Sequence, residues 1–225
     1  MPQLTRRHLI KAGLGAVALG SFAWIKPVDK GGDHSLYFTQ LSSSLHKGKY
    51  ARPTLVIDKS LLQKNIQTLK EQIGSGYKYR IVAKSLPSIE LLKYISQESG
   101  SKRFMVFNEN FLLQLSREIS DADVLLGKPL PVNAAHYFYR HIDQNANFQA
   151  SKQLQWLIDT PERLKQYQKL AQQSGQAMRI NIELDVGLHR GGVKDNNTLV
   201  DMLSIIRSEP LFSFSGFMGY EPHVV

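Results

Sequence analysis

Short apolar runs and helix-like segments alternate along most of this chain, and this alternation limits the folds that it can adopt. The strand-like runs are residues 53–58, 81–83, 103–108, 123–127 and 154–159, which are mainly apolar, and residues 178–186 and 212–220, in which apolar residues alternate with polar or small ones. Segments with apolar residues at helical spacing separate the runs, and each strand-plus-helix unit takes about thirty residues or a little less. Such a repeat predicts βαβ crossovers and a parallel sheet.

The number of strand-plus-helix units limits the chain to two α/β architectures. A (β/α)8 TIM barrel needs eight units and about 250 residues. The chain has 225 residues and room for roughly six units. It therefore predicts either an incomplete barrel, made of the first six βα units, or an open doubly wound sheet. No Gly-rich phosphate-binding fingerprint follows any of the runs, which argues against a dinucleotide-binding sheet.

One lysine ends the second apolar run. Lys84 follows residues 81–83, and small and turn-forming residues separate it from the next helical segment. The carboxyl ends of strands are where α/β folds bind ligands. Desolvation there favours an uncharged amine, which is the form that makes a Schiff base with a carbonyl or with pyridoxal phosphate. The alternative is a strand-end lysine that only reaches water, and Lys128 ends another run in the same way.

Two later strand ends carry further candidate residues. Arg190 lies in a glycine-rich loop, where its guanidinium can present fixed N–H donors to an anion or a phenolate. Tyr220 offers a ring that can stack on a heteroaromatic cofactor. The alternatives are a surface arginine in a loop and a packing tyrosine. Glu221 and His223 are residue types that can bind a metal, but the sequence offers no third ligand near them, so we predict no metal site.

The first 25 residues have the pattern of an export signal. Arg6 and Arg7 precede an apolar stretch rich in Gly and Ala, residues 12–25. A basic region before a short apolar region is typical of a secretory signal, and paired arginines indicate the twin-arginine route. The stretch is short for a membrane span, and it shows no clear cleavage site. We expect export to the periplasm by the twin-arginine machinery, with the segment cut or kept as an anchor; the alternative is an amphipathic leader on a cytoplasmic protein.

Composition narrows the remaining possibilities. The chain has no cysteine, which excludes a disulfide framework and a thiolate zinc site. Its net charge is +9, of which residues 1–30 contribute +4 and the remainder +5, with no long basic run. We therefore expect no nucleic-acid partner. Glycines and serines within residues 26–50 predict an irregular linker before a globular part, residues 51–225.

Taken together, these residues resemble the fold-type III pyridoxal-phosphate enzymes, which share an alanine-racemase-like N-terminal barrel. In particular they resemble the D-threonine aldolase and D-serine dehydratase branch. Residues 53–58 resemble the opening strand of that family, and Ala83-Lys84-Ser85 resembles its lysine motif. Residues 183–193, which include Arg190, are similar to its most recognisable segment. Residues 216–223 resemble the strand that carries an aromatic or histidine residue beside the cofactor ring.

The resemblance implies a cofactor and a class of reaction. It implies pyridoxal 5'-phosphate bound to Lys84 as a Schiff base, with Arg190 at the phenolic oxygen and Tyr220 beside the ring. The expected activity is that of a lyase or isomerase acting on an amino acid: a racemase, or an enzyme like D-threonine aldolase or D-serine dehydratase. The full-length form is expected to be a homodimer. Two other functions stay open, a non-catalytic pyridoxal-phosphate carrier and a Schiff-base barrel aldolase that works without this cofactor.

The chain also departs from that family in two ways. Val82 and Leu86 stand where the branch usually has histidines, which leaves the substrate open. The last barrel strands and the C-terminal β-domain have no counterpart in these 225 residues. We therefore expect the first part of a longer protein.

Overall fold

The computed structural model describes residues 31–85, 88–143 and 147–224, and it divides the chain into two compact units, residues 1–56 and 57–225. The predicted export segment lies outside the described residues, as does Leu86. Within the described ranges, no helix is both long and apolar enough to cross a membrane.

The first unit contains a helix that the sequence did not predict. Helix α2 (Leu36–Lys47) lies where we expected an irregular linker. That prediction was wrong because the glycines flank the helix instead of interrupting it: Gly48 follows its last residue. The serines inside it are tolerated, since the Ser44 hydroxyl donates to the Gln40 carbonyl at 3.0 Å. No residue of α2 is buried.

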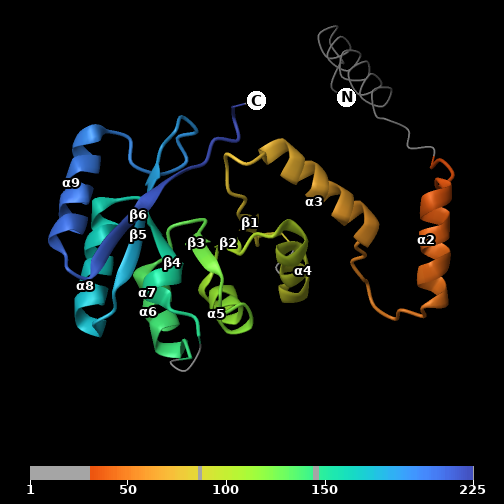
Figure 1. The fold of residues 1–225 in the computed structure, drawn as a ribbon, viewed down its shortest axis with the longest axis horizontal. Helices are drawn as coiled ribbons and strands as arrows, with labels where there is room; N and C mark the ends of the chain where they lie inside the picture. The colour runs from red at the N-terminus through yellow and green to blue at the C-terminus, as the bar shows by residue number, and fades with distance from the viewer. Residues whose placement is uncertain (1–30, 86–87, 144–146, 225) are drawn as a thin grey trace, which may run out of the picture. The chain divides into compact units, whose positions relative to one another are not determined.

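Six parallel strands form the sheet of the second unit, and their order in space is their order in sequence (Figure 1). They are β1 (Ile81–Val82), β2 (Arg103–Val106), β3 (Asp123–Leu126), β4 (Leu154–Ile158), β5 (Met178–Leu184) and β6 (Phe212–Gly219). A doubly wound sheet reverses its strand order at a switch point, whereas a barrel does not. The strand order therefore confirms the α/β class and a partial TIM-barrel-like domain.

Seven helices of the second unit lie among the described residues, and the local sequence marks where several of them begin. They are α3 (Lys59–Ile73), α4 (Ile89–Ser99), α5 (Glu109–Glu118), α6 (Val132–His141), α7 (Ala150–Gln153), α8 (Pro161–Ser174) and α9 (Asn196–Ser208). The Asp58 carboxylate accepts from the Ser60 and Leu61 amides and caps α3. Thr160 caps α8, and Pro161 occupies its first turn, where a missing N–H is harmless. The short helix α7 was not predicted.

The first predicted strand is absent. Residues 53–58 lie outside the sheet, and the side chains of Leu55, Val56 and Ile57 are 81%, 45% and 46% exposed. An apolar run becomes a strand only where a neighbouring strand satisfies its backbone groups. Among the described residues, the six-stranded sheet provides no such partner. The prediction was wrong for that reason, and β1 is the first strand.

The two faces of the sheet differ in polarity. One face packs on the helices, and it includes the fully buried side chains of Phe104, Val124 and Ile180. Successive residues of a strand point to opposite faces, so Asp123, Gln155 and Asn181 belong to the other face. There the Gln155 amide donates to Asp123 at 2.8 Å and accepts from Asn181 at 3.4 Å. The packed face fixes the strands, and so fixes the positions of their carboxyl ends.

Candidate functional site

The three predicted site residues lie just beyond the carboxyl ends of strands. Lys84 follows β1, Arg190 lies in the loop after β5, and Tyr220 follows β6. Because all the strands are parallel, these ends share one edge of the sheet. Strands β1 and β6 are the two outer strands, so Lys84 lies at one side of this edge and Tyr220 at the other. The structure thus groups Arg190 with Tyr220 and leaves Lys84 apart.

Lys84 presents an accessible amine. Pairing with β2 continues up to the preceding residue, since the Ala83 amide donates to the Met105 carbonyl at 2.9 Å. The Lys84 side chain is exposed, and its Nζ lies 5.4 Å from the centre of the Phe107 ring. The backbone is therefore held by the sheet while the amine remains free to meet a ligand.

Arg190 is held between an acid and a ring. Its Nη2 lies 3.4 Å from Glu183 Oε1, and its Cζ lies 4.2 Å from the centre of the Tyr220 ring. The Glu183 side chain is only 6% exposed. Burial raises the pKa of Glu183, and the Arg190 charge partly opposes that rise. We predicted Arg190 and Tyr220 from the sequence, but not Glu183, the buried partner of Arg190.

The loop that carries Arg190 is closed onto β5. The Val193 amide donates to the Glu183 carbonyl at 2.8 Å, and the Asp185 amide donates to the Val193 carbonyl at 2.9 Å. Gly192 makes this approach possible: its φ is +96°, and a β-carbon there would lie 2.6 Å from the Leu184 carbonyl carbon. Only glycine fits such a conformation without strain.

A second contact inside the loop involves Asp185 and His189. The Asp185 side chain is 3% exposed, and its Oδ1 accepts from the amides of Gly187 and His189 at 3.1 and 3.0 Å. Its Oδ2 lies 2.9 Å from His189 Nδ1. The contact with the His189 ring, together with the hydrogen bonds from the Gly187 and His189 amides, lowers the pKa of Asp185 to about 2. The sequence signal for this contact is an aspartate two residues before a glycine, which is typical of a side chain that caps a turn.

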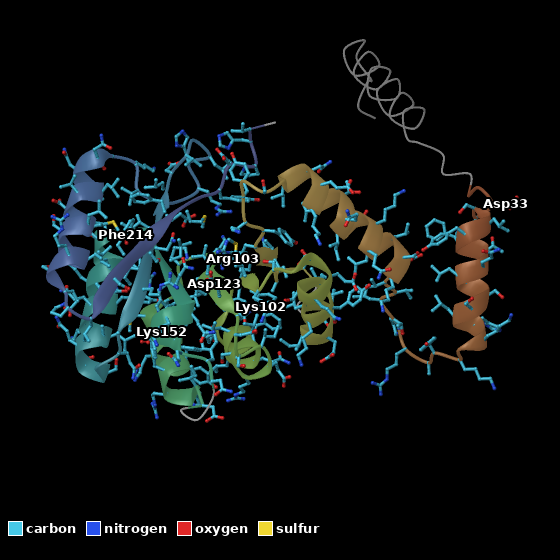
Figure 2. All side chains as sticks on the ribbon, in the orientation of Figure 1. Asp33, Lys102, Arg103, Asp123, Lys152 and Phe214 are labelled. Carbon is cyan, nitrogen blue, oxygen red and sulfur yellow. The ribbon has the colours of Figure 1, made fainter. Side chains whose placement is uncertain are left out.

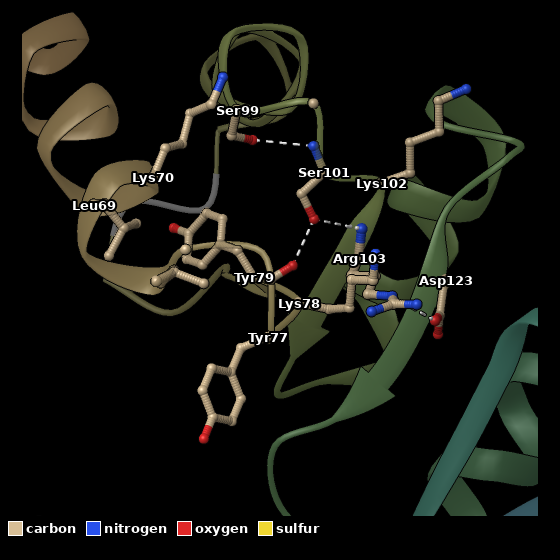
Figure 3. Close-up of a pocket in the computed structure, with 13 residues that line it drawn as sticks. Leu69, Lys70, Tyr77, Lys78, Tyr79, Ser99, Ser101, Lys102, Arg103 and Asp123 are labelled. Atoms are coloured by element: carbon tan, nitrogen blue, oxygen red, sulfur yellow. Dashed lines mark hydrogen bonds and ion pairs between the residues drawn. The ribbon is translucent and has the colours of Figure 1, made fainter.

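A separate hollow of about 570 Å³ lies at the opposite, amino-terminal end of the strands. Figure 3 shows Tyr79, Lys102, Arg103 and Asp123 around it. Its acidic group is already paired, since Asp123 contacts Arg80 at 3.3 Å and Arg103 at 3.5 Å. Figure 2 also places Lys102, Arg103 and Asp123 together. None of the predicted site residues lines this hollow, so we place the candidate site at the carboxyl edge of the sheet.

Comparison with known families identifies the fold. The model of the family described as "Alanine racemase, N-terminal domain" matches residues 57–224, which is most of the chain. The chain belongs to this family. Members of the alanine racemase N-terminal domain family have the fold-type III architecture and use pyridoxal phosphate. The match begins at the second compact unit and includes Lys84, Arg190 and Tyr220.

Solved structures agree with this assignment at the level of the fold. Alanine racemase from Oenococcus oeni is 21% identical, with a TM-score of 0.57, and the match covers 72% of this chain and 44% of that one. For D-threo-3-hydroxyaspartate dehydratase from Delftia sp. HT23 the identity is 18%, the TM-score 0.62 and the coverage 76% and 44%. Histidine racemase from Leuconostoc mesenteroides subsp. sake is 16% identical, with a TM-score of 0.57, and the match covers 71% of this chain and 41% of that one. The chain thus spans less than half the length of these proteins, and no curated protein sequence matches it.

Among the described residues, no group of three or more His, Cys, Asp or Glu side chains is placed to hold a metal ion.

Proposed function

We propose that this chain is the cofactor-binding part of a pyridoxal-phosphate-dependent enzyme that acts on amino acids, with Lys84 as the residue that holds the cofactor covalently. The observation that carries the proposal is the accessible amine of Lys84 at the carboxyl edge of a domain whose family uses this cofactor. When bound, pyridoxal phosphate withdraws electrons from the bonds at the Cα atom of an amino acid.

The chemistry of the residues at this edge fits the cofactor. Lys84 offers a primary amine, Arg190 offers fixed N–H donors, and Tyr220 offers an aromatic face. Arg190 would bind the phenolic oxygen of the cofactor and Tyr220 would lie beside its ring. The contact between Arg190 and Tyr220 supports these roles, because it places a cation and a ring at one strand end.

The reaction that we favour belongs to the lyase or isomerase type. The structural neighbours include enzymes named as racemases and as a dehydratase of a hydroxy amino acid. We infer that this chain is part of an enzyme like D-threonine aldolase, D-serine dehydratase or an amino acid racemase, and that its full-length form is a homodimer. We also propose that residues 1–25 direct export by the twin-arginine route. Residues 26–50 would link this export segment to residues 51–225, which would bind the cofactor.

Chemical trapping tests the assignment of Lys84. Protein incubated with pyridoxal phosphate should absorb as a protonated imine, and borohydride should bleach this absorbance and fix the label to the protein. Peptide mapping should then find the label on Lys84. Lys84→Ala should abolish the absorbance, whereas the matched control Lys128→Ala should keep it. Label on Lys128, or an imine in the Lys84→Ala protein, would show that the central residue is wrong.

The same preparation separates the two other functions. A labelled protein that converts no D- or L-amino acid would indicate a carrier of pyridoxal phosphate. A colourless protein that borohydride couples to a sugar or a keto acid would indicate an aldolase that uses the amine directly.

A further inference from the structure

Helix α2, near the red end of the ribbon in Figure 1, carries an apolar stripe that is not buried within the described part of the chain. At about 100° per residue, four side chains fall within about 100° of its circumference. They are Tyr37, Phe38, Leu41 and Leu45. No residue of α2 is buried, and Tyr37 and Phe38 are 43% and 55% exposed. Every other described helix of ten or more residues buries at least one side chain, so α2 differs from the helices that pack on the sheet.

The remainder of the circumference of α2 is mostly polar. Gln40, Ser43 and Lys47 lie opposite the apolar stripe, and Leu36, in the first turn, is the one apolar residue on that side. A helix that divides its apolar and polar residues in this way needs an apolar partner on one side and water on the other.

The charge around α2 has one sign. Residues 34–56 contain no Asp or Glu, and Lys47, Lys49 and Arg52 give them a net charge of +3 with histidine neutral. These three residues form a basic cluster at the carboxyl end of the helix. Short helices that combine an aromatic and leucine face with basic residues lie in the interface of bilayers, and anionic lipids attract them.

The position of α2 in the chain supports the same partner. The helix begins shortly after the apolar residues 12–25, which we propose direct export across a membrane. Such a segment brings whatever follows it close to a bilayer. The four side chains of the stripe offer only a few hundred Å² of apolar surface, which is less than a stable protein interface of about 1,000 Å² needs. A bilayer has no such minimum, because the basic cluster adds its own attraction.

We propose that α2 is a membrane-surface helix: its apolar stripe inserts at the boundary between headgroups and acyl chains, and its basic cluster contacts the phosphates of anionic lipids. The helix lies along the surface and does not cross the bilayer. It would keep the domain at the membrane whether or not residues 1–25 are removed. This inference goes beyond the proposed function and does not depend on the cofactor.

A label on each face of α2 tests the orientation. The chain has no cysteine, so one introduced cysteine can carry a fluorophore that responds to the polarity around it. Leu41→Cys places the label in the stripe, and the matched control Ser43→Cys places it on the opposite face. The full chain is mixed with vesicles of phosphatidylcholine and phosphatidylglycerol in equal parts. We expect the label at position 41 to shift to shorter wavelength and to be reached by a quencher dissolved in the lipid, whereas the label at position 43 stays in water.

Titration of the label at position 41 with the same vesicles tests the basic cluster. We expect Lys47→Gln combined with Lys49→Gln to weaken binding by about 25-fold, since each basic residue near an anionic surface contributes about five-fold. Lys165→Gln combined with Lys169→Gln removes the same charge from exposed positions of α8 and should leave the affinity nearly unchanged. Vesicles of phosphatidylcholine alone should bind the wild-type helix more weakly than the mixed vesicles.

Three results would overturn the membrane-surface helix. The first is a label at position 41 that stays in water while the chain binds vesicles, because residues 1–25 would then account for the binding. The second is an equal response of the labels at positions 41 and 43. The third is shielding of the label at position 41 without vesicles, which would show that protein covers the stripe, and a second copy of the chain if the shielding grows with protein concentration. Absence of pyridoxal-phosphate binding would refute the proposed function and leave this inference standing.

Discussion

Replacing Gly192 with alanine should detach the loop that carries Arg190. The new β-carbon would lie 2.6 and 2.7 Å from backbone atoms of Leu184 and Asp185, and backbone atoms cannot turn aside as a flexible side chain can. Such an overlap costs about 1–3 kcal/mol. The φ of +96° adds a penalty of about 1–3 kcal/mol for any residue with a side chain. We therefore expect a loss of about 2–6 kcal/mol in the free energy of the closed loop.

Two measurements separate loop opening from unfolding of the whole domain. If the loop stays closed, the domain bears the strain, and the melting temperature should fall by about 2–4 °C for each kcal/mol. If the loop opens instead, the melting temperature changes little. The amides of Val193 and Asp185, whose hydrogen bonds close the loop, should then exchange with solvent about as fast as exposed amides.

Gly191→Ala is the matched control. No atom lies within 4 Å of the β-carbon that alanine would add at Gly191, and its backbone is not left-handed. Alanine there should be neutral or slightly stabilising, since it reduces the freedom of the unfolded chain. Equal melting temperatures and equal amide exchange in the two variants would refute the close approach of Gly192 as the reason for its presence.

Two further predictions concern other parts of the chain. Replacing both Arg6 and Arg7 with lysine should leave the protein in the cytoplasm, and undiminished periplasmic protein in cell fractionation would remove the twin-arginine interpretation. Because the pKa of Asp185 is lowered from 3.8 to about 2, its contribution to the closed loop is present above about pH 4 and is lost as the pH falls toward 2. Amide exchange at His189 should therefore lose protection over that interval, and protection that persists at pH 2, or an identical profile in Asp185→Asn, would contradict the assigned role of this acid.

The sequence predicted the sheet well because its strands are buried on a packed face. Residues 154–159 are a nearly continuous apolar run, as central parallel strands are, and residues 178–186 alternate between apolar and polar residues. Both segments become strands within one or two residues of the expected bounds. Residues 53–58 are also an apolar run but are coil, because a strand also needs a partner that its own sequence does not encode. The sequence did not predict helix α2 because serines and flanking glycines lower helix propensity, although they do not forbid a helix.

The candidate site was predicted in its parts but not in its arrangement. Lys84, Arg190 and Tyr220 stand at strand ends, and a strand end is visible in sequence as the last residue of an apolar run. The contact of Glu183 with Arg190 depends on how the loop folds back through Gly192, which spacing alone does not determine. Glu183 is one of four polar residues that alternate with apolar ones in residues 178–186, so nothing in this pattern sets it apart from the others.

The strand order has a consequence for how this domain is made. Each strand of the sheet pairs with the one synthesised just before it, so every βα unit finds its partner already present when it leaves the ribosome. Contacts between sequence neighbours require only short loop closures, which keeps the search for the native pairing brief. The domain can therefore assemble vectorially during translation, with the growing edge always at the newest strand. Translation pauses placed between units, for example before β4, should be tolerated, because the strands already made form a sheet to which the next strand adds.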